Sequence, residues 1–521
     1  MATALGRAPV RLRIGVTGHR AFPDEQVIAA RVDEVLARLQ RTLPSDPTTP
    51  VLFEVVSPLG EGADRIVAER ILRIPHAILE VPLPLARSEY EQDFASQESR
   101  ERFNALLERA ERVCVVGGHD RVDAYRVTGI YVVDSCDLLI AVWDGLPSRG
   151  PGGTADVVGR AWDQAMPVFR IGTAPPFDIQ DPTVPVAPYL IHEIKRFNDA
   201  DAPAPSSVSR LVPASVTPGG ERRRLQTCLE WVEPHYERAA AIAKRARRRF
   251  TWGSRALFLL SGFALLAAAL SVTSDGEAAS RARGFAYLEV VLMVSVLALW
   301  LLVRHRAHDR WITSRFLAER LRSARFLAFA GERTGICSTP EGERGEGSQE
   351  WINRVCREVW RTRPRIDDAD RAVDDVKALL IEGWVAQQLA YYEDRATGHL
   401  VASRVFTIAG AALFGGTILA AGLHASELVK GGLSHWVVVL TIALPAFGAS
   451  LAGIAGLELH ARHAARFRLM ARRLGDLRDR LGSVTEMDGV REIALRIETE
   501  LRTEGEAWID VMRFQDVELP S

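Results

Sequence analysis

Four long apolar runs dominate the hydrophobic pattern of the chain from residue 256 onward. They cover residues 256–272, 285–303, 405–423 and 436–457, and a short polar turn joins the two members of each pair. Each run reaches the length of about 17 residues that a helix needs to cross the hydrocarbon of a bilayer. The pattern therefore predicts two membrane hairpins, with four transmembrane helices in all.

Basic residues border both hairpins on their outer sides. The first hairpin lies between the basic segment 244–249 and Arg304-His305-Arg306, and a segment rich in arginine and histidine, 460–473, follows the second. Because positive charge gathers on the cytoplasmic side of membrane proteins, we expect a multi-pass protein of the inner (plasma) membrane with both termini in the cytoplasm. A buried soluble hairpin is the alternative, but it would not need these basic borders.

The first third of the chain shows a different pattern, in which short apolar strands alternate with segments of helical periodicity. The predicted strands cover residues 12–16, 51–56, 77–81, 113–116, 138–143 and 168–171. This alternation is typical of a parallel sheet with helices on both faces. The predicted fold class is an α/β doubly wound parallel-sheet N-terminal domain, followed by an all-α membrane region with four transmembrane helices and long cytoplasmic helices.

These patterns divide the chain into five segments. The α/β domain covers residues 10–175. The segment 176–220, which is rich in proline, alanine and serine, is interpreted as a linker that contains one short candidate helix at residues 189–197. Residues 221–330 are predicted to form an amphipathic helix and the first two-span unit. Residues 331–370 are predicted to be a flexible cytoplasmic loop, because glycine, glutamate and serine dominate their first half. Residues 371–515 are predicted to form the second two-span unit and a C-terminal cytoplasmic helix.

Composition and charge argue against two classes of function. The 521 residues include 65 Lys and Arg and 66 Asp and Glu, and this balance gives no support to nucleic-acid binding. The five cysteines are an odd number without a C-x-x-C pair, so neither a disulfide framework nor a zinc site is indicated. We therefore expect neither a nucleic-acid partner nor a bound metal ion.

Glycine-bearing turns that follow three of the predicted strands form the candidate site. Because the carboxyl ends of parallel strands meet at one edge, these turns are expected to converge there. Glycine lets backbone N–H groups approach an anion closely, and helix N-termini add partial positive charge, so such an edge suits a phosphate. One such turn alone is ordinary loop chemistry, and only the coincidence of three favours a ligand site. The predicted ligand-binding residues are Gly15, Thr17, Gly18, His19, Arg20, Gly60, Glu61, Gly62, Asp64, Asp144, Gly145, Gly152, Gly153 and Thr154.

The side chains of this set indicate how a nucleotide would be held. Thr17 and Thr154 offer hydroxyl donors, and Arg20 offers a charged clamp for phosphate. Glu61 or Asp64 would accept hydrogen bonds from ribose hydroxyls. The dinucleotide signature G-x-G-x-x-G is absent after the first strand, which disfavours a standard NAD dehydrogenase.

Three segments of the α/β domain resemble the SLOG superfamily, a Rossmann-like group that includes the cytokinin-activating LOG enzymes, DNA-processing protein A and sensors of nucleotide-derived signals. The segments are Ile14-Gly15-Val16-Thr17-Gly18-His19-Arg20, Ser57-Pro58-Leu59-Gly60-Glu61-Gly62-Ala63-Asp64 and Pro151-Gly152-Gly153-Thr154. The resemblance implies that their glycines and threonines, with Glu61, line a nucleotide pocket. The chain departs from the Pro-Gly-Gly-x-Gly-Thr-x-x-Glu motif of the hydrolytic LOG enzymes, because Ala155 and Asp156 follow Thr154. This departure favours sensing over N-glycosidic cleavage.

The second membrane hairpin and its flanking helices resemble SLATT domains, two-span membrane effectors found beside SLOG sensors in bacterial conflict systems. The resemblance is carried by residues 384–395, by the third and fourth apolar runs, and by the arginine-rich segment that ends near Trp508. The first hairpin, with residues 311–327, is similar to a more diverged copy. This resemblance implies a protein that responds to a nucleotide second messenger by permeabilising the membrane.

Together these features predict a nucleotide-sensing membrane effector of antiphage defence. A homo-oligomer would bind a nucleotide or ADP-ribose-like second messenger, without a cofactor or catalytic residues, and form a pore in the lipid bilayer or permeabilise it. The alternative is a membrane-anchored nucleotide or NAD hydrolase with LOG-like phosphoribohydrolase chemistry, in which Glu61 or Asp64 is the acid or base and His19 or Arg20 an electrostatic partner. A passive scaffold that tethers a partner would leave the glycine turns unexplained.

Overall fold

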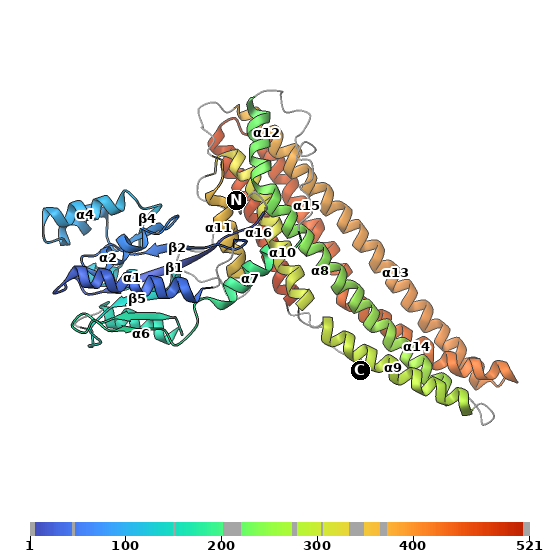
Figure 1. Ribbon diagram of the computed structural model, residues 1–521. Helices are drawn as coiled ribbons and strands as arrows, with labels where there is room; N and C mark the ends of the chain where they lie inside the picture. Colours follow the sequence, from blue (N-terminus) through green and yellow to red (C-terminus); the bar gives the residue numbers. More distant parts are fainter. Residues whose placement is uncertain are drawn as a thin grey trace. The chain divides into compact units, whose positions relative to one another are not determined.

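The computed structural model describes residues 6–43, 47–148, 152–201, 220–273, 279–303, 306–332, 349–364 and 372–513 (Figure 1). The chain divides into two compact units, which we call the α/β unit (Met1–Asp201 and Gly335–Thr362) and the helical unit (Ala202–Thr334 and Arg363–Ser521). The predicted fold class is confirmed, because a largely parallel sheet with helices forms the first unit and helices form the second. Both units are discontinuous, so the chain enters the α/β unit a second time after the first membrane hairpin.

One sheet forms the core of the α/β unit, with strand order β4-β3-β2-β1-β5-β6-β7. The strands β1 to β6 run parallel, and β7 is antiparallel to β6. The chain order reverses beside β1, so the switch point, where ligands of such sheets bind, lies between β1 and β5. The strands are β1 (Val10–Gly18), β2 (Val51–Val56), β3 (Ile78–Leu83), β4 (Arg112–Val115), β5 (Leu138–Val142), β6 (Val168–Ile171) and β7 (Ile179–Gln180).

Helices in the connections pack on this sheet and bury its apolar residues. The pairs α1 with α2 and α5 with α6 are in contact, and α2 and α5 both contact β1. A Cβ atom at Gly15 would lie 2.9 Å from Val132 Cγ1 of α5, so glycine at this position lets α5 approach the sheet. The helices are α1 (Glu25–Thr42), α2 (Ala63–Ile71), α3 (Arg87–Tyr90), the 3-10 helix η2 (Glu91–Asp93), α4 (Gln97–Leu107), α5 (Arg121–Ser135), α6 (Thr154–Asp163), α7 (Pro188–Asn198) and α11 (Glu350–Arg361).

The first part of the predicted linker 176–220 belongs to the α/β unit, which corrects the domain boundary. It forms β7 and then α7, whose apolar face buries Leu190, Ile194 and Phe197. At the end of α7, the side chain of Asn198 accepts a hydrogen bond from the Ala8 backbone N–H at 2.9 Å and donates to the Ala8 carbonyl at 2.8 Å. The helix itself agrees with the helical stretch expected at residues 189–197, but the proline-rich composition around that stretch led to its assignment to the linker. Residues 202–219 lie outside the described residues.

Residues 331–370 are not a loop throughout, which corrects a second prediction. Residues 350–361 within this segment form α11, and the helix buries Trp351, Val355 and Val359. Trp351 lies 6.0 Å from the ring of Phe197 in α7, measured between ring centroids, and α11 also contacts β1. The spacing of four residues between these buried side chains has helical periodicity. The polar composition of the surrounding sequence outweighed that short signal.

The helical unit contains four helices that are long and apolar enough to cross a membrane: Arg223–Val272, Ser280–Leu301, Val373–Ala425 and Leu433–Ser483. Each contains one of the four predicted apolar runs, except that Ser280–Leu301 ends two residues before the end of the run 285–303. The first of them belongs to α8, which runs without a break from the basic segment into the first apolar run. The elements of the unit are α8 (Gly220–Val272), α9 (Ala279–Val303), α10 (Arg306–Ala330), α12 (Val373–Ala378), the π-helix η7 (Leu379–Val385), α13 (Ala386–Ala425), α14 (Gly432–Glu458), α15 (His460–Ser483) and α16 (Met487–Arg513).

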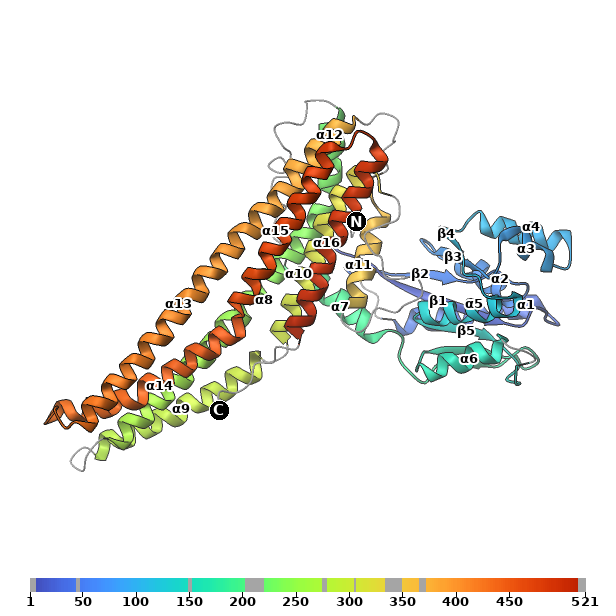
Figure 2. The same cartoon turned by 180° about the vertical axis from the view of Figure 1, so that it is seen from behind.

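The long helices of this unit run alongside one another. The helix α8 contacts α9, α10 and α14, and α13 contacts α14 and α15 (Figures 1 and 2). At the contact of α8 with α14, a Cβ atom at Gly262 would lie 3.0 Å from Ser450 Oγ and 3.1 Å from Phe447. Phe447 also meets Phe263 edge-on, with ring centroids 5.3 Å apart. Small and aromatic residues thus hold the first and fourth apolar runs together, as is usual for helices in lipid.

Candidate functional site

The ends of β1 and β5 meet at the carboxyl edge of the sheet, where the sequence places the candidate site. The His19 backbone N–H donates a hydrogen bond to the Val142 carbonyl at 3.1 Å, which extends the pairing of β1 with β5 by one residue. The His19 Nε2 atom lies 3.5 Å from Asp144 Oδ1, and both side chains are partly exposed. These two residues therefore mark the switch point of the sheet at its surface.

The turn between β2 and α2 reaches the same place. The first N–H group of α2, that of Ala63, donates to the His19 carbonyl at 3.0 Å. Gly62 has a φ of 79°, and a Cβ atom there would overlap the backbone of His19 and Arg20. A Cβ atom at Gly18 would likewise lie 2.6 Å from the Val142 carbonyl oxygen. Gly62 thus allows the turns after β1 and β2 to pack backbone against backbone, and Gly18 allows the end of β1 to lie close to β5 and to Ala63.

The hydrogen-bonding groups of this second turn are engaged within the protein. The Gly60 N–H donates to Asp64 Oδ2 at 3.1 Å. The Glu61 carboxylate accepts hydrogen bonds from the Ala95 N–H, at 3.0 Å, and from the Ser99 hydroxyl. Glu61 thus holds the segment between η2 and α4 against the turn. A ligand phosphate would have to find its donors elsewhere than at Gly60 and Ala63.

The two carboxylates of the turn differ in their electrostatic setting. Burial raises the pKa of Asp64 to about 7, although the Gly60 hydrogen bond and the charge of Arg20 oppose that rise. Burial also acts to raise the pKa of Glu61, but hydrogen bonds from Ser99 and Ala95 outweigh it, so that this pKa is lowered. Asp64 can therefore change its charge near neutral pH, whereas Glu61 stays ionised.

Four residues beside Arg20 were not predicted from the sequence, namely Tyr90, Asp93, Arg121 and Tyr125. Arg20 is exposed, and its guanidinium carbon lies 5.8 Å from the centre of the Tyr125 ring. The Tyr125 hydroxyl and the Arg121 guanidinium both donate to the Asp93 carboxylate. A signal for this side of the site was present, because Gly117-Gly118 after β4 is a further glycine turn, and Asp120 after it caps α5. Tyr90 completes the group and lies 6.0 Å from Tyr125 between ring centroids.

For the remaining predicted residues, the contacts described below are with residues other than His19 and Arg20. Thr17 is buried within β1. The Gly145 turn is held by the Leu146 N–H, which donates to Asp144 Oδ1 at 3.0 Å. The Gly152 N–H donates to Asp156 Oδ2 at 2.9 Å. A Cβ atom at Gly152 would lie 2.9 Å from the Arg126 Cα of α5, and Gly153 and Thr154 follow as the N-cap and first residue of α6. Pro151 lies outside the described residues.

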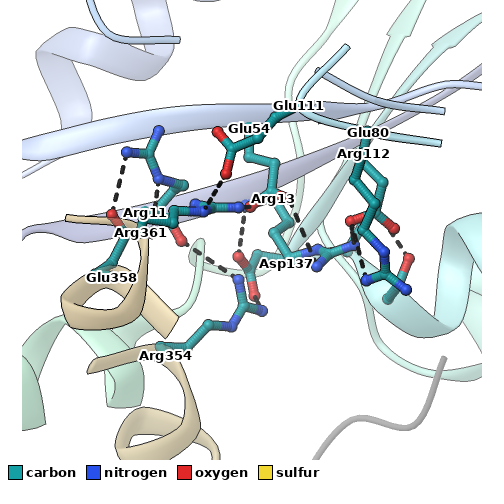
Figure 3. A network of polar contacts seen from close by, with 12 residues as sticks. Arg11, Arg13, Glu54, Glu80, Glu111, Arg112, Asp137, Arg354, Glu358 and Arg361 are labelled. Atoms are coloured by element: carbon teal, nitrogen blue, oxygen red, sulfur yellow. Dashed lines mark hydrogen bonds and ion pairs between the residues drawn. The ribbon is translucent and has the colours of Figure 1, made fainter. Parts of the chain in front are cut away.

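The opposite, amino edge of the sheet carries a buried set of ion pairs, which we call the α11 network (Figure 3). Arg11 Nε of β1 lies 2.7 Å from Glu358 Oε1 of α11, and Arg354 Nη2 of α11 lies 2.7 Å from Asp137 Oδ1, just before β5. Arg361 Nη2 lies 3.2 Å from Glu54 Oε2 of β2. The helix α11 is therefore joined to the amino ends of three neighbouring strands.

A second layer of the α11 network lies within the sheet. Arg13 Nη2 is 3.0 Å from Glu80 Oε2, and Glu80 Oε1 accepts a hydrogen bond from the Tyr131 hydroxyl at 2.6 Å. Burial acts to raise the pKa of Glu54, but the charges of Arg13 and Arg361 outweigh it and lower that pKa. Charged residues inside three strands were the available sequence signal, because buried charges need partners.

Comparison with known proteins adds no relative. No protein-family model and no curated protein matches the chain, so the SLOG and SLATT resemblances stay predictions. Among the described residues, no group of three or more His, Cys, Asp or Glu side chains is placed to hold a metal ion. The candidate site is therefore defined by its own geometry: His19 with Asp144, and Arg20 near Asp64 and Tyr125, at the carboxyl edge.

Proposed function

We propose that the protein is a ligand-responsive membrane effector. The α/β unit binds a nucleotide-derived second messenger at its carboxyl edge, and the helical unit responds by permeabilising the membrane or opening a pore. The observation that carries this proposal is α11. Its sequence lies between the two membrane hairpins, yet it folds into the α/β unit through the buried α11 network.

This insertion supports a mechanical role for the α/β unit. A domain attached only at residue 201 would communicate with the membrane through a single connection. Because α11 is held in the sheet, the chain that leaves α10 and the chain that leads to α12 are both anchored to the same body. A rearrangement of the sheet would therefore reach the end of the first hairpin and the start of the second.

The carboxyl edge supplies groups suited to a phosphorylated ligand. Arg20 is exposed and offers a planar pair of donors to a phosphate. Tyr125 offers an aromatic face beside it, and Asp64 in its neutral form offers a hydroxyl donor. The phosphate is thus held by side chains, since Gly60 and Ala63 already use their N–H groups. The ligand must bind the active conformation more tightly than the resting one, with a coupling of about 1–3 kcal/mol per site.

The four long apolar helices support a multi-pass membrane protein. We propose that it lies in the inner membrane with both termini in the cytoplasm and that several copies assemble. Within one chain, only 6% of the apolar window of Ser280–Leu301 and 6% of that of Val373–Ala425 is buried. These surfaces are available to lipid and to a second copy. Subunits assembled through them would sum the coupling of several ligand sites.

Dye release from liposomes tests the proposal directly. The full chain is reconstituted with a trapped dye and titrated with ADP-ribose, NAD, a cyclic mononucleotide and a cyclic dinucleotide, while calorimetry follows binding. We expect one of these to bind and to trigger release. The Arg20→Glu variant should bind it at least about tenfold more weakly, with membrane insertion unchanged. Arg73→Glu, an exposed arginine of the same unit, is the matched control. If none of the probes binds, or if Arg20→Glu behaves like the control, the proposed site is wrong.

One observation favours a second function, a membrane-anchored nucleotide or NAD hydrolase. The pKa of Asp64, which burial raises to about 7, is suited to a general acid or base. Chromatography of the same reactions would detect product, and Asp64→Asn should abolish its formation. Product without dye release would favour the hydrolase, whereas release without product would favour the effector.

A further inference from the structure

The helical unit contains a cavity of about 400 Å³ that lies among α8, α10, α13, α14, α15 and α16. This volume falls within the range of about 300–1,000 Å³ that is usual for small-molecule sites. Arg255 in its wall directly precedes the first apolar run, and Leu457 ends the fourth. His399, shortly before the third run, also lines it. The cavity therefore lies at the level where three apolar runs meet their basic borders.

Positive charge in the wall of this cavity exceeds negative charge. Its carboxylates are Asp394 and Glu458, and Glu458 is engaged with Arg255 and His460, each at 2.7 Å. Four arginines stand against these two carboxylates, so the wall carries a formal charge of +2 when its histidines are neutral. A cavity of this sign attracts anions.

Three of the arginines form no direct ion pair. In the described part of the chain, Arg247, Arg315 and Arg395 have no carboxylate oxygen within 4.0 Å, although the charges of Glu319 and Glu504 act on Arg315 from outside the wall. Instead, the Arg315 guanidinium carbon lies 4.3 Å from the centre of the Trp508 ring, and that of Arg395 lies 5.4 Å from the centre of the Tyr391 ring. Stacking on an aromatic ring leaves the N–H edge of a guanidinium free to donate.

A buried hydroxyl in the same wall also lacks a partner. Ser254 is 1% exposed, and among the described residues its Oγ atom has no hydrogen-bond partner. An unsatisfied buried hydroxyl is unfavourable, and a ligand oxygen in the cavity would satisfy it. Guanidiniums from α8, α10 and α13 and this hydroxyl of α8 thus line one partly open cavity.

We infer that this cavity binds a phosphate group. Forked guanidinium donors match the geometry of phosphate oxygens, and an ion with two negative charges balances the wall. Two sources share this chemistry: the head group of an anionic phospholipid that enters from the bilayer, and a free phosphorylated metabolite. The inference does not depend on the ligand proposed for the α/β unit, because every residue that lines the cavity belongs to the helical unit.

Titration of the full chain in a neutral detergent tests the inference. Tryptophan fluorescence reports binding, because Trp311 and Trp508 line the cavity. The probes are dioctanoyl phosphatidic acid, dioctanoylglycerol, which differs by lacking the phosphate, and inorganic phosphate. We expect saturable binding of a phosphate-bearing probe and no binding of dioctanoylglycerol. Binding should weaken about tenfold in Arg395→Ala and less in Arg395→Lys, which keeps the charge.

The control variant is Arg468→Ala, which removes an exposed arginine of α15 outside the cavity wall. Far-UV circular dichroism verifies that all variants keep their helices. Phosphatidic acid binding without phosphate binding identifies a lipid ligand, and phosphate binding of similar strength identifies a free one; both support the inference. If neither probe binds, if dioctanoylglycerol binds as well as phosphatidic acid, or if Arg395→Ala and Arg468→Ala bind equally well, the inference is overturned.

Discussion

The two edges of the parallel sheet carry similar charged residues but use them differently. At the amino edge, Arg11, Asp137 and Arg354 are 8%, 9% and 7% exposed and form ion pairs within the α11 network. At the carboxyl edge, Arg20 is exposed, and the side chains of His19 and Asp144 are 30% and 24% exposed. The chain fills one edge with its own helix and leaves polar groups at the other edge within reach of a ligand.

This difference separates attachment from recognition. A buried ion pair contributes little net stability compared with an apolar pair of the same volume. Removing one of its two residues is costly, however, because the other charge is then buried without a partner. We therefore attribute the stability of the α11 contact to Trp351, Val355 and Val359, and its alignment on the strands to the α11 network. The partly exposed groups of the carboxyl edge do not hold a helix on the sheet, so their hydrogen-bonding atoms are available to a ligand.

The largest expected effect comes from breaking the α11 network on one side. Arg354→Met leaves the Asp137 carboxylate buried without its cation, because Arg354 Nη2 lies 2.7 Å from it. We expect the free energy of unfolding of the α/β unit to fall by about 3–5 kcal/mol. Urea unfolding of the full chain in detergent, with hydrogen exchange of residues 350–361, measures this loss.

The control for this variant is Arg31→Met, which removes an arginine that is 39% exposed and paired with Glu34 on α1. Its effect should stay within about 0.5 kcal/mol. An Arg354→Met variant as stable as Arg31→Met would show that the amino edge tolerates an unpaired carboxylate. The proposed contrast between the two edges would then fail.

A smaller effect measures the coupling across the contact. Arg11 and Glu358 form a pair at 2.7 Å, and Arg11 also donates to the Phe53 carbonyl at 3.2 Å. In a double-mutant cycle of Arg11→Met and Glu358→Gln, we expect the combined loss to be smaller than the sum of the single losses by about 2 kcal/mol. Urea midpoints of the four proteins give this value. Additive losses would mean that the two side chains act independently and that the pair does not align α11.

The strands were predictable because apolar runs such as residues 51–56 and 138–143 end at turns. That the turns meet at the carboxyl edge followed from the general rule for parallel sheets. The order of the strands, and hence the switch point beside His19, was not predicted from the sequence and comes from the structure. The two-residue strand β7 was too short to leave a pattern. The helix α11 was missed because its buried face includes the charged residues Arg354 and Glu358, and a charged residue in a sequence shows no sign of the partner that buries it.

The glycines of the candidate site show a second limit of prediction from the sequence. Gly18 and Gly62 were predicted at the correct place, but they serve the close packing of two backbones. A glycine turn for phosphate and one for backbone packing have the same sequence, since both need only the absence of a Cβ atom. Arg20, in contrast, was predicted as a clamp and is exposed beside Asp64 and Tyr125. Its ability to bind a ligand stays a prediction.

The smallest expected effect concerns the dependence of stability on pH at the carboxyl edge. Burial raises the pKa of Asp64 from 3.8 to about 7 in the folded protein. Between those values the unfolded chain releases a proton that the folded chain keeps, so this group makes stability fall as pH rises from about 4 to about 7.

Asp64→Asn mimics the neutral acid and should remove that decline. We expect the variant to unfold at the same temperature as the parent near pH 4 and at a higher one above pH 7. The full pKa shift would correspond to about 4 kcal/mol, but Asp64 is partly exposed, so solvent screening reduces the expected difference to a fraction of that value. Asp181→Asn, which alters an exposed carboxylate, should leave the pH profile unchanged. A profile of Asp64→Asn parallel to that of the parent would show that Asp64 ionises normally, and the carboxyl edge would then lack the acid–base group that distinguishes it from the amino edge.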